Sequence, residues 1–255
     1  MKKALCVLLV ATLFTACKKN NAEPTPASGK VEANWSSSAQ YASWQNDGYT
    51  VYNNIWGSGA GSQSIWANSY SNWGIWANHP NTGGIKSYPN STKYVGVALS
   101  NLNNCSSSFN VTTPSGGAWE VAYDIWDNNN HYETMLWMNS TGNTDGSGNV
   151  KPISYNWNAA GNPVPVYTNQ SIGGHTWNVF RGNNGSNDVF SFLRTSKTNS
   201  GTVDVKAIQN WIKGQGWFGN ITLGNVQFGY EITSCYGNNG SGANFTTNSY
   251  SVNYN

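Results

Sequence analysis

The stretch Trp119-Glu-Val-Ala-Tyr-Asp-Ile-Trp-Asp-Asn-Asn-Asn-His-Tyr-Glu-Thr-Met-Leu-Trp-Met138 contains two runs rich in aromatic and aliphatic residues, with a short polar segment between them. Each run has the length and composition of a β-strand, and the connection between them is short enough to require a tight turn. Similar short runs, bounded by Gly, Asn, Ser and Pro, make up most of the remaining chain. This pattern predicts an all-β fold of two packed antiparallel sheets.

Helical periodicity is scarce outside one segment. Residues 204–213 place Val205, Ile208 and Ile212 at helical spacing, which predicts one short helix. We expect strands over residues 49–55, 95–99, 119–126, 132–138, 175–181, 189–194, 223–233 and 245–254. No fixed-period repeat is present, which argues against propellers and solenoids.

The N-terminus has the pattern of a bacterial lipoprotein signal. A basic start and an apolar stretch end in Leu13-Phe-Thr-Ala-Cys17, so residues 1–17 are interpreted as the signal and Cys17 as the lipidation site. An ordinary signal peptide cleaved elsewhere is the alternative. Residues 18–32 are too poor in apolar side chains to fold and predict a flexible tether. We expect one domain over residues 33–255, secreted through the Sec pathway and anchored at the outer membrane or cell surface.

Composition points to a carbohydrate partner. The net charge is +2 and no basic patch is evident, which argues against nucleic acid. Tryptophan (13) and tyrosine (14) are abundant, and together with Asn and Gly they favour sugars, whose C–H faces lie against aromatic rings. The alternative is that a β-rich protein uses these rings in its strands. We expect a monomer.

Cysteine and histidine offer no cofactor site. Cys105 and Cys235 could form one disulfide in an oxidising exterior if their Cα atoms are close enough. The histidines at positions 79, 131 and 175 lack metal-ligand spacing, so no metal or other cofactor is expected. No Gly-x-Ser-x-Gly nucleophile motif occurs.

Four of the eleven acidic residues lie inside apolar strand runs: Glu120, Asp124, Glu133 and Glu231. An acid in such a run is unfavourable unless it faces water, is paired or is functional. We assign Glu120 to the face opposite Asp124 and interpret it as a solvated charge at a sheet edge.

Strand alternation indicates what shares a face with each remaining acid. Glu133 lies on one face with Met135 and Trp137, as a substrate cleft requires. Asp124 shares a face with Ala122 and Trp126. Glu231 shares one with Gln227, Gly229 and Thr233, and Gly229 is expected to leave open space beside it. Two carboxyls facing across a sugar-lined groove are what glycoside hydrolysis needs.

Seven ordered motifs sharpen this interpretation, and together they cover nearly the whole domain from Tyr49 onward: Tyr49-Thr-Val-Tyr-Asn-Asn-Ile-Trp-Gly57, Ile85-Lys-Ser-Tyr-Pro-Asn90, Ala122-Tyr-Asp124, Tyr132-Glu-Thr-Met-Leu-Trp137, Trp177-Asn-Val-Phe-Arg-Gly-Asn-Asn-Gly185, Ser191-Phe-Leu193 and Val226-Gln-Phe-Gly-Tyr-Glu231. The chain resembles glycoside hydrolase family 12, the retaining endo-β-1,4-glucanases and xyloglucanases. The resemblance implies a β-jelly roll with a concave substrate cleft.

The resemblance also implies roles for particular residues. Glu133 would be the nucleophile, Glu231 the acid/base, and Asp124 would lie beside the nucleophile. Asn54 and Trp56 would line the substrate-binding subsites, and Met135 and Trp137 would support the cleft floor. The family often has Gly-Thr-Glu-Pro around the acid/base where this chain has Gly229-Tyr-Glu-Ile232, which puts substrate preference in doubt but not the chemistry.

Two other functions remain open at this level. A non-catalytic polysaccharide-binding lipoprotein would keep the aromatic face without needing both Glu133 and Glu231. A jelly-roll xylanase would keep the two carboxyls. The activity that the resemblance implies is retaining, endo-acting hydrolysis of β-1,4-glucan or xyloglucan.

Overall fold

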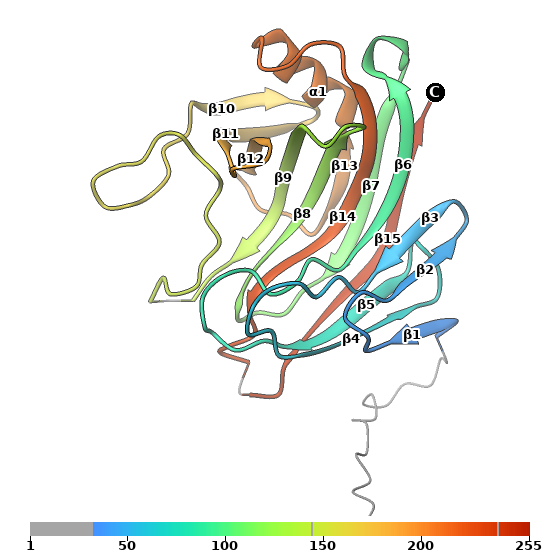
Figure 1. The fold of residues 1–255 in the computed structure, drawn as a ribbon, viewed down its shortest axis with the longest axis vertical. Helices are drawn as coiled ribbons and strands as arrows, with labels where there is room; N and C mark the ends of the chain where they lie inside the picture. Colours follow the sequence, from blue (N-terminus) through green and yellow to red (C-terminus); the bar gives the residue numbers. More distant parts are fainter. Residues whose placement is uncertain (1–32, 144, 239) are drawn as a thin grey trace, which may run out of the picture. The chain divides into compact units, whose positions relative to one another are not determined.

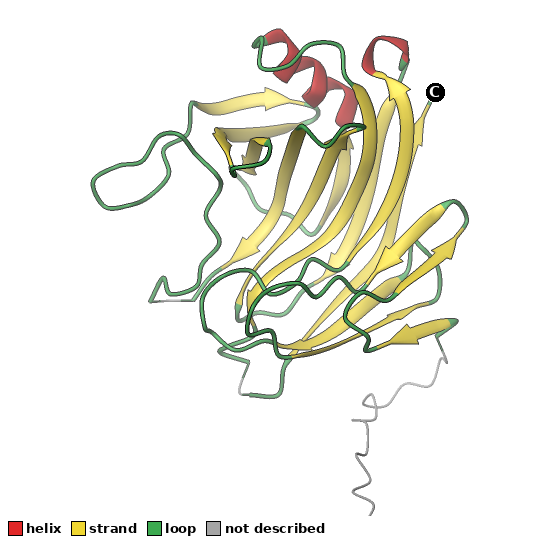
Figure 2. Cartoon of the chain, in the orientation of Figure 1, coloured by secondary structure: helices red, strands yellow, loops and turns green. Residues whose placement is uncertain are grey.

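The computed structural model describes residues 33–143, 145–238 and 240–255, and its compact unit spans Ala33–Asn255. The predicted signal, tether and Cys17 lie outside the described residues. Figure 2 shows that the described chain consists mainly of strands, as the sequence predicts. Within the described ranges, no helix has the length and apolar character needed to span a bilayer.

The larger sheet has nine strands and carries every acidic strand residue singled out above. Its order is β10-β11-β12-β9-β8-β14-β6-β3-β2. The central strands are long and bend along their length (Figure 1). All its pairings are antiparallel except β12 with β9. The strand bounds are β2 Ser43–Asn46, β3 Tyr49–Tyr52, β6 Asn90–Ala98, β8 Ala118–Asp127, β9 Tyr132–Thr141, β10 Tyr167–Ile172, β11 His175–Asn183, β12 Asp188–Arg194 and β14 Thr222–Ser234.

The smaller sheet has six antiparallel strands in the order β1-β4-β5-β15-β7-β13. Several of these strands are rich in Ser and Asn and are not among the predicted ones. The strand bounds are β1 Trp35–Ser37, β4 Ser62–Ala67, β5 Trp73–Asn78, β7 Cys105–Thr112, β13 Ser200–Asp204 and β15 Ala243–Tyr254. A 3₁₀ turn, η1, spans Leu99–Asn101.

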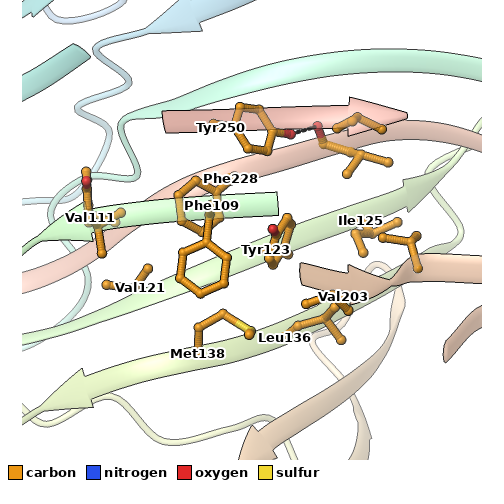
Figure 3. Close-up of a cluster of buried hydrophobic side chains, with 14 of the residues drawn as sticks. Phe109, Val111, Val121, Tyr123, Ile125, Leu136, Met138, Val203, Phe228 and Tyr250 are labelled. Atoms are coloured by element: carbon orange, nitrogen blue, oxygen red, sulfur yellow. Dashed lines mark hydrogen bonds between the residues drawn. The ribbon is translucent and has the colours of Figure 1, made fainter. Parts of the chain in front are cut away.

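Aromatic side chains from both sheets form the core between them (Figure 3). Phe228 on β14 lies with its ring centroid 4.8 Å from that of Tyr123 on β8 and 5.2 Å from that of Tyr250 on β15. The Tyr250 hydroxyl donates to the Val226 carbonyl at 2.9 Å, so its polar atom is satisfied inside the core. This packing fixes which face of β8 and β14 is turned away from the smaller sheet.

The α-helix α1 of the described residues spans Val205–Gly214 and closely matches the predicted segment. Asp204 precedes it and accepts a hydrogen bond from the Ala207 backbone N–H at 2.8 Å, which caps the first turn. Val205, Ile208 and Ile212 are fully buried, as their spacing predicts.

The possible disulfide is not formed, because Cys105 and Cys235 are both free and buried. Cys105 pairs with Tyr254 at one end of β15, whereas Cys235 follows β14 and donates its backbone N–H to His79, just beyond β5. The β5 end of the sheet pairs with the start of β15. The two thiols are therefore separated by almost the length of a twelve-residue strand, roughly 35–40 Å at about 3.3 Å per residue.

Candidate active site

Four carboxyls come together on three adjacent strands of the larger sheet. Glu231 lies on β14, Glu120 and Asp124 on β8, and Glu133 on β9. In the sheet, β8 is hydrogen-bonded to both of the other two strands. Glu120, Asp124 and Glu231 are buried, and Glu133 is half-buried. Burial of several acids on one face of a sheet is unfavourable for structure alone.

The face of β9 that carries Glu133 is the predicted one. Met135 and Trp137 form a small apolar cluster with Ala122 of β8, separate from the main core. Leu136, which points the other way, is fully buried in the core between the sheets. The alternation therefore puts a thioether and an indole on the face of the glutamate.

Glu231 is held by the same alternation on β14. Its neighbours Tyr230 and Ile232 are fully buried in the core, so Glu231 is directed to the opposite face. The expectation that Gly229 leaves open space is wrong. A Cβ there would lie 2.0 Å from the Pro89 carbonyl oxygen, so backbone atoms occupy the space that a side chain would need.

The prediction that Glu120 is a solvated charge at a sheet edge is wrong. Glu120 is 0% exposed and pairs in register with Glu231, so it is neither solvated nor at an edge. Residues 120 and 124 are four positions apart on one strand, and alternation therefore puts them on the same face. Correctly counted alternation was the signal that identifies Glu120.

Burial is the largest influence on the charge of the cluster. It raises the pKa of Glu133 to about 7, with a further increase from the negative charge of Glu231. Burial also raises the pKa of Asp124 well above its usual range, and the charge of Glu133 adds to this. For Glu231, burial raises the pKa, and the neighbouring Glu120 carboxyl partly offsets that increase. Carboxyls with raised pKa values can hold protons near neutral pH.

A polar side chain that the sequence analysis did not single out contacts Glu133. The Asn184 amide donates to Glu133 Oε2 at 3.3 Å from the turn between β11 and β12. Asn184 is part of the motif ending at Gly185, and the parallel pairing of β12 with β9 brings that turn beside Glu133. Local sequence patterns carry no signal for the pairing of β12 with β9, because the two strands are far apart along the chain.

The motifs at residues 49–57 and 85–90 are hydrogen-bonded to each other beside these strands. Asn54, at a positive φ of 42°, donates its side-chain amide to the Tyr88 carbonyl at 3.1 Å. The Tyr88 hydroxyl in turn donates to the Ala122 carbonyl of β8 at 3.2 Å. Trp56 lies two residues after Asn54 and is 48% exposed, so part of its side chain is accessible to a ligand. Asn54 is thus tied to the strand of Asp124.

The described part of the chain holds no group of three or more His, Cys, Asp and Glu side chains arranged to bind a metal ion. Three tryptophans from the N-terminal part of the domain belong to the core or its margin, and Trp73 among them is fully buried. Trp35 and Trp44 stack on each other at a centroid distance of 6.1 Å and pack against the core.

Comparison with known proteins gives a consistent family. The model of the family described as Glycosyl hydrolase family 12 matches residues 47–255. Xyloglucan-specific endo-beta-1,4-glucanase A of Emericella nidulans is 32% identical over 228 residues, covering 80% of this chain and 84% of the relative. A probable xyloglucan-specific endo-beta-1,4-glucanase A of Aspergillus flavus is 31% identical over 229 residues, covering 84% and 88%.

Among solved structures, the xyloglucanase domain of NopAA, a type three effector from Sinorhizobium fredii, in complex with cellobiose, is 53% identical with a TM-score of 0.82. It covers 88% of this chain and 100% of that domain. The native family 12 xyloglucanase from Bacillus licheniformis is 25% identical with a TM-score of 0.69, covering 87% of this chain and 100% of that one.

Proposed function

This chain belongs to glycoside (glycosyl) hydrolase family 12 and is a glycosidase, and on that premise we propose that it hydrolyses β-1,4-glucans internally by double displacement. Glu133 is the proposed nucleophile and Glu231 the proposed acid/base. The observation that carries the proposal is that these two glutamates, from the strands on either side of β8, face the same side of the sheet, where the negative charge of Glu231 raises the pKa of Glu133.

The first step uses the two glutamates in opposite protonation states. Glu231 donates its proton to the glycosidic oxygen while the Glu133 carboxylate attacks the anomeric carbon, which forms a covalent glycosyl-enzyme and releases the first product. A proton on Glu231 removes the negative charge that raises the pKa of Glu133. Protonation of one residue therefore favours ionisation of the other, as this step requires.

The second step reverses the roles. Glu231, now a carboxylate, takes a proton from water, and the water oxygen attacks the anomeric carbon as Glu133 departs. Two inversions at the anomeric carbon retain its configuration. Asp124 and Asn184 act on Glu133: Asn184 holds one of its oxygens by a hydrogen bond, and Asp124 lies beside it on β8.

Xyloglucan is the substrate we propose first. The relatives in Emericella nidulans and Aspergillus flavus, and the Sinorhizobium fredii domain, are all named for xyloglucan. Asn54 and Trp56 would bind the glucan backbone, with Trp56 stacking on a sugar ring through its exposed face. Met135 and Trp137 would form the floor beneath the nucleophile.

The test is reducing-sugar release from xyloglucan, carboxymethylcellulose and mixed-linkage glucan by wild type, Glu133→Ala and Glu231→Ala. Folding of each variant is checked by circular dichroism. We expect both variants to fold and to lose polymer hydrolysis, and proton NMR of the first product to show the β-anomer. A folded wild-type protein that binds these polymers but releases no sugar would instead be a binding module, and an α-anomer would rule out double displacement.

We also propose that the enzyme acts as a monomer held at the cell surface or outer membrane by lipid on Cys17. The support is the signal-like sequence that ends at that cysteine. Cys17→Ala is expected to release the protein from the membrane fraction, whereas Cys6→Ala, within the signal, is not. Mass spectrometry of the mature N-terminus checks this directly, and an unmodified N-terminus elsewhere would overturn it.

A further inference from the structure

The mechanism above leaves the Glu120 carboxyl without a role. Glu120 on β8 and Glu231 on β14 are register partners in neighbouring strands, with exposures of 0% and 7%. Directly opposed residues of an antiparallel pair have Cβ atoms about 4.5–5.5 Å apart. The sheet therefore holds these two side chains side by side on one face.

No donor in the described residues reaches Glu120. Both of its carboxyl oxygens are shielded from solvent and have no hydrogen-bond partner among the described residues. An ionised carboxylate in that setting is strongly unfavourable, and two facing carboxylates are worse. A proton on Glu120 removes both problems, because its hydroxyl can then donate to Glu231.

The other charged and titratable groups around Glu120 favour that proton. Asp124 on its own strand and Glu133 on β9 are both acids whose negative charges oppose ionisation of Glu120. Tyr88 uses its hydroxyl on a backbone carbonyl of β8. Lys86 lies on the segment bonded to β14, but its ammonium is directed to two backbone carbonyls of the loop before it.

We propose that neutral Glu120 donates a hydrogen bond to Glu231 and thereby sets the pH at which Glu231 releases its proton. The inference rests on the proposed role of Glu231 as acid/base. Glu120 is a positioning residue, because it acts on Glu231 and not on the reacting atoms. When Glu231 has protonated the leaving oxygen, this hydrogen bond stabilises the carboxylate that remains.

The directions of the pKa changes agree with this arrangement. Burial raises the pKa of Glu120 well above its usual range, and the charge of Glu231 and the hydrogen bond to it add to the effect. The same bond lowers the pKa of Glu231, against the increase from burial. Glu231 is therefore a stronger acid than burial alone would leave it.

The test compares pH profiles of kcat/KM on the best polymer for wild type, Glu120→Gln and Glu120→Leu. The basic limb reports loss of the proton from the acid/base. Gln is uncharged, nearly isosteric and still a donor, so we expect the basic limb to stay in place. Leu cannot donate, so we expect that limb to move to higher pH by about one unit, the effect of one hydrogen bond to a carboxylate.

Three outcomes would overturn the inference. A basic limb that moves to lower pH in Glu120→Gln would mean that Glu120 is anionic in the wild type. A Leu variant that folds and loses rate with its limbs unmoved would mean a structural role only. If Leu does not fold, carbon-13 NMR of the wild-type glutamate carboxyls decides: Glu120 should remain neutral at pH 7, and an ionised Glu120 refutes the proposal.

Failure of the proposed function is seen separately. If Glu231→Ala hydrolyses polymer at the wild-type rate, the acid/base assignment itself is wrong, whatever Glu120 does. If Glu231→Ala is inactive and the Glu120 variants leave the basic limb unmoved, only the present inference fails.

Discussion

Removing the charge of Glu231 should lower the pKa of Glu133, and the structure sets an upper limit on that decrease. Glu133 has a pKa of about 7, raised from an ordinary value of 4.5 first by burial and second by the negative charge of Glu231. The substitution Glu231→Gln removes the charge and leaves the burial. The pKa of Glu133 should therefore fall, but it should remain above its ordinary value.

The size of the fall follows from the order of the two causes. The total increase is about 2.5, equivalent to roughly 3.4 kcal/mol at about 1.36 kcal/mol per pH unit. Because burial is the larger cause, the charge accounts for less than half of it. We therefore expect the acid limb of Glu231→Gln to fall by less than about 1.2 pH units.

The assay uses an aryl β-cellobioside with a 2,4-dinitrophenyl leaving group, which departs without help from an acid. In this substrate kcat/KM reports the first step alone, and its acid limb reports ionisation of the nucleophile. Asp145→Asn is the matched control, because it removes one charge from a fully exposed carboxyl that does not affect Glu133.

Three results would refute this reasoning. An unmoved acid limb in Glu231→Gln would mean that Glu231 carries no negative charge in the pH range where Glu133 ionises. A limb that rises would give the interaction the wrong sign. A fall well beyond about 1.2 pH units would make charge, not burial, the main reason for the high pKa of Glu133.

Three further predictions concern stability. Because burial raises the pKa of Glu120 well above its ordinary 4.5, the folded state keeps a proton that the unfolded chain releases, so the contribution of Glu120 to stability should decrease as pH rises above about 4.5. Thermal melts should show Glu120→Gln becoming more stable relative to wild type as pH rises through that value, and a constant difference would contradict it. Gly229→Ala should lose about 1–3 kcal/mol through the clash with the Pro89 carbonyl, whereas Gly214→Ala, where an added Cβ meets nothing, should not; urea denaturation of the two variants tests this. Asp204→Ala should lose about 1 kcal/mol of helix capping and lower Tm by roughly 2–4 °C, with polymer hydrolysis unchanged, and an unaltered Tm would contradict it.

Local patterns in the sequence were sufficient where a strand is buried on one face. On β9, Glu133 and Met135 alternate with Leu136, so the outer face and the core face could both be predicted from residue spacing. The helix at Val205–Gly214 was equally accessible, because its apolar spacing and the preceding Asp204 are local signals.

Strands built from small polar residues were missed for a physical reason. In β4, Ser62 and Ser64 alternate with the buried Gln63 and Ile65, so the period-two pattern is present but carries little hydrophobic contrast. Such a strand is stabilised by pairing with β5 and by the sheet that it joins. Neither contact can be predicted from the six residues of the strand itself.

The sequence by itself determined the all-β class, the faces of the principal strands and the family, through seven ordered motifs. Only the tertiary structure decided which side chains meet. It separated Cys105 from Cys235, brought Asn184 to Glu133, and put Glu120 beside Glu231. Alternation along one strand is set by local backbone geometry, whereas contacts between strands depend on register and pairing order across the whole chain.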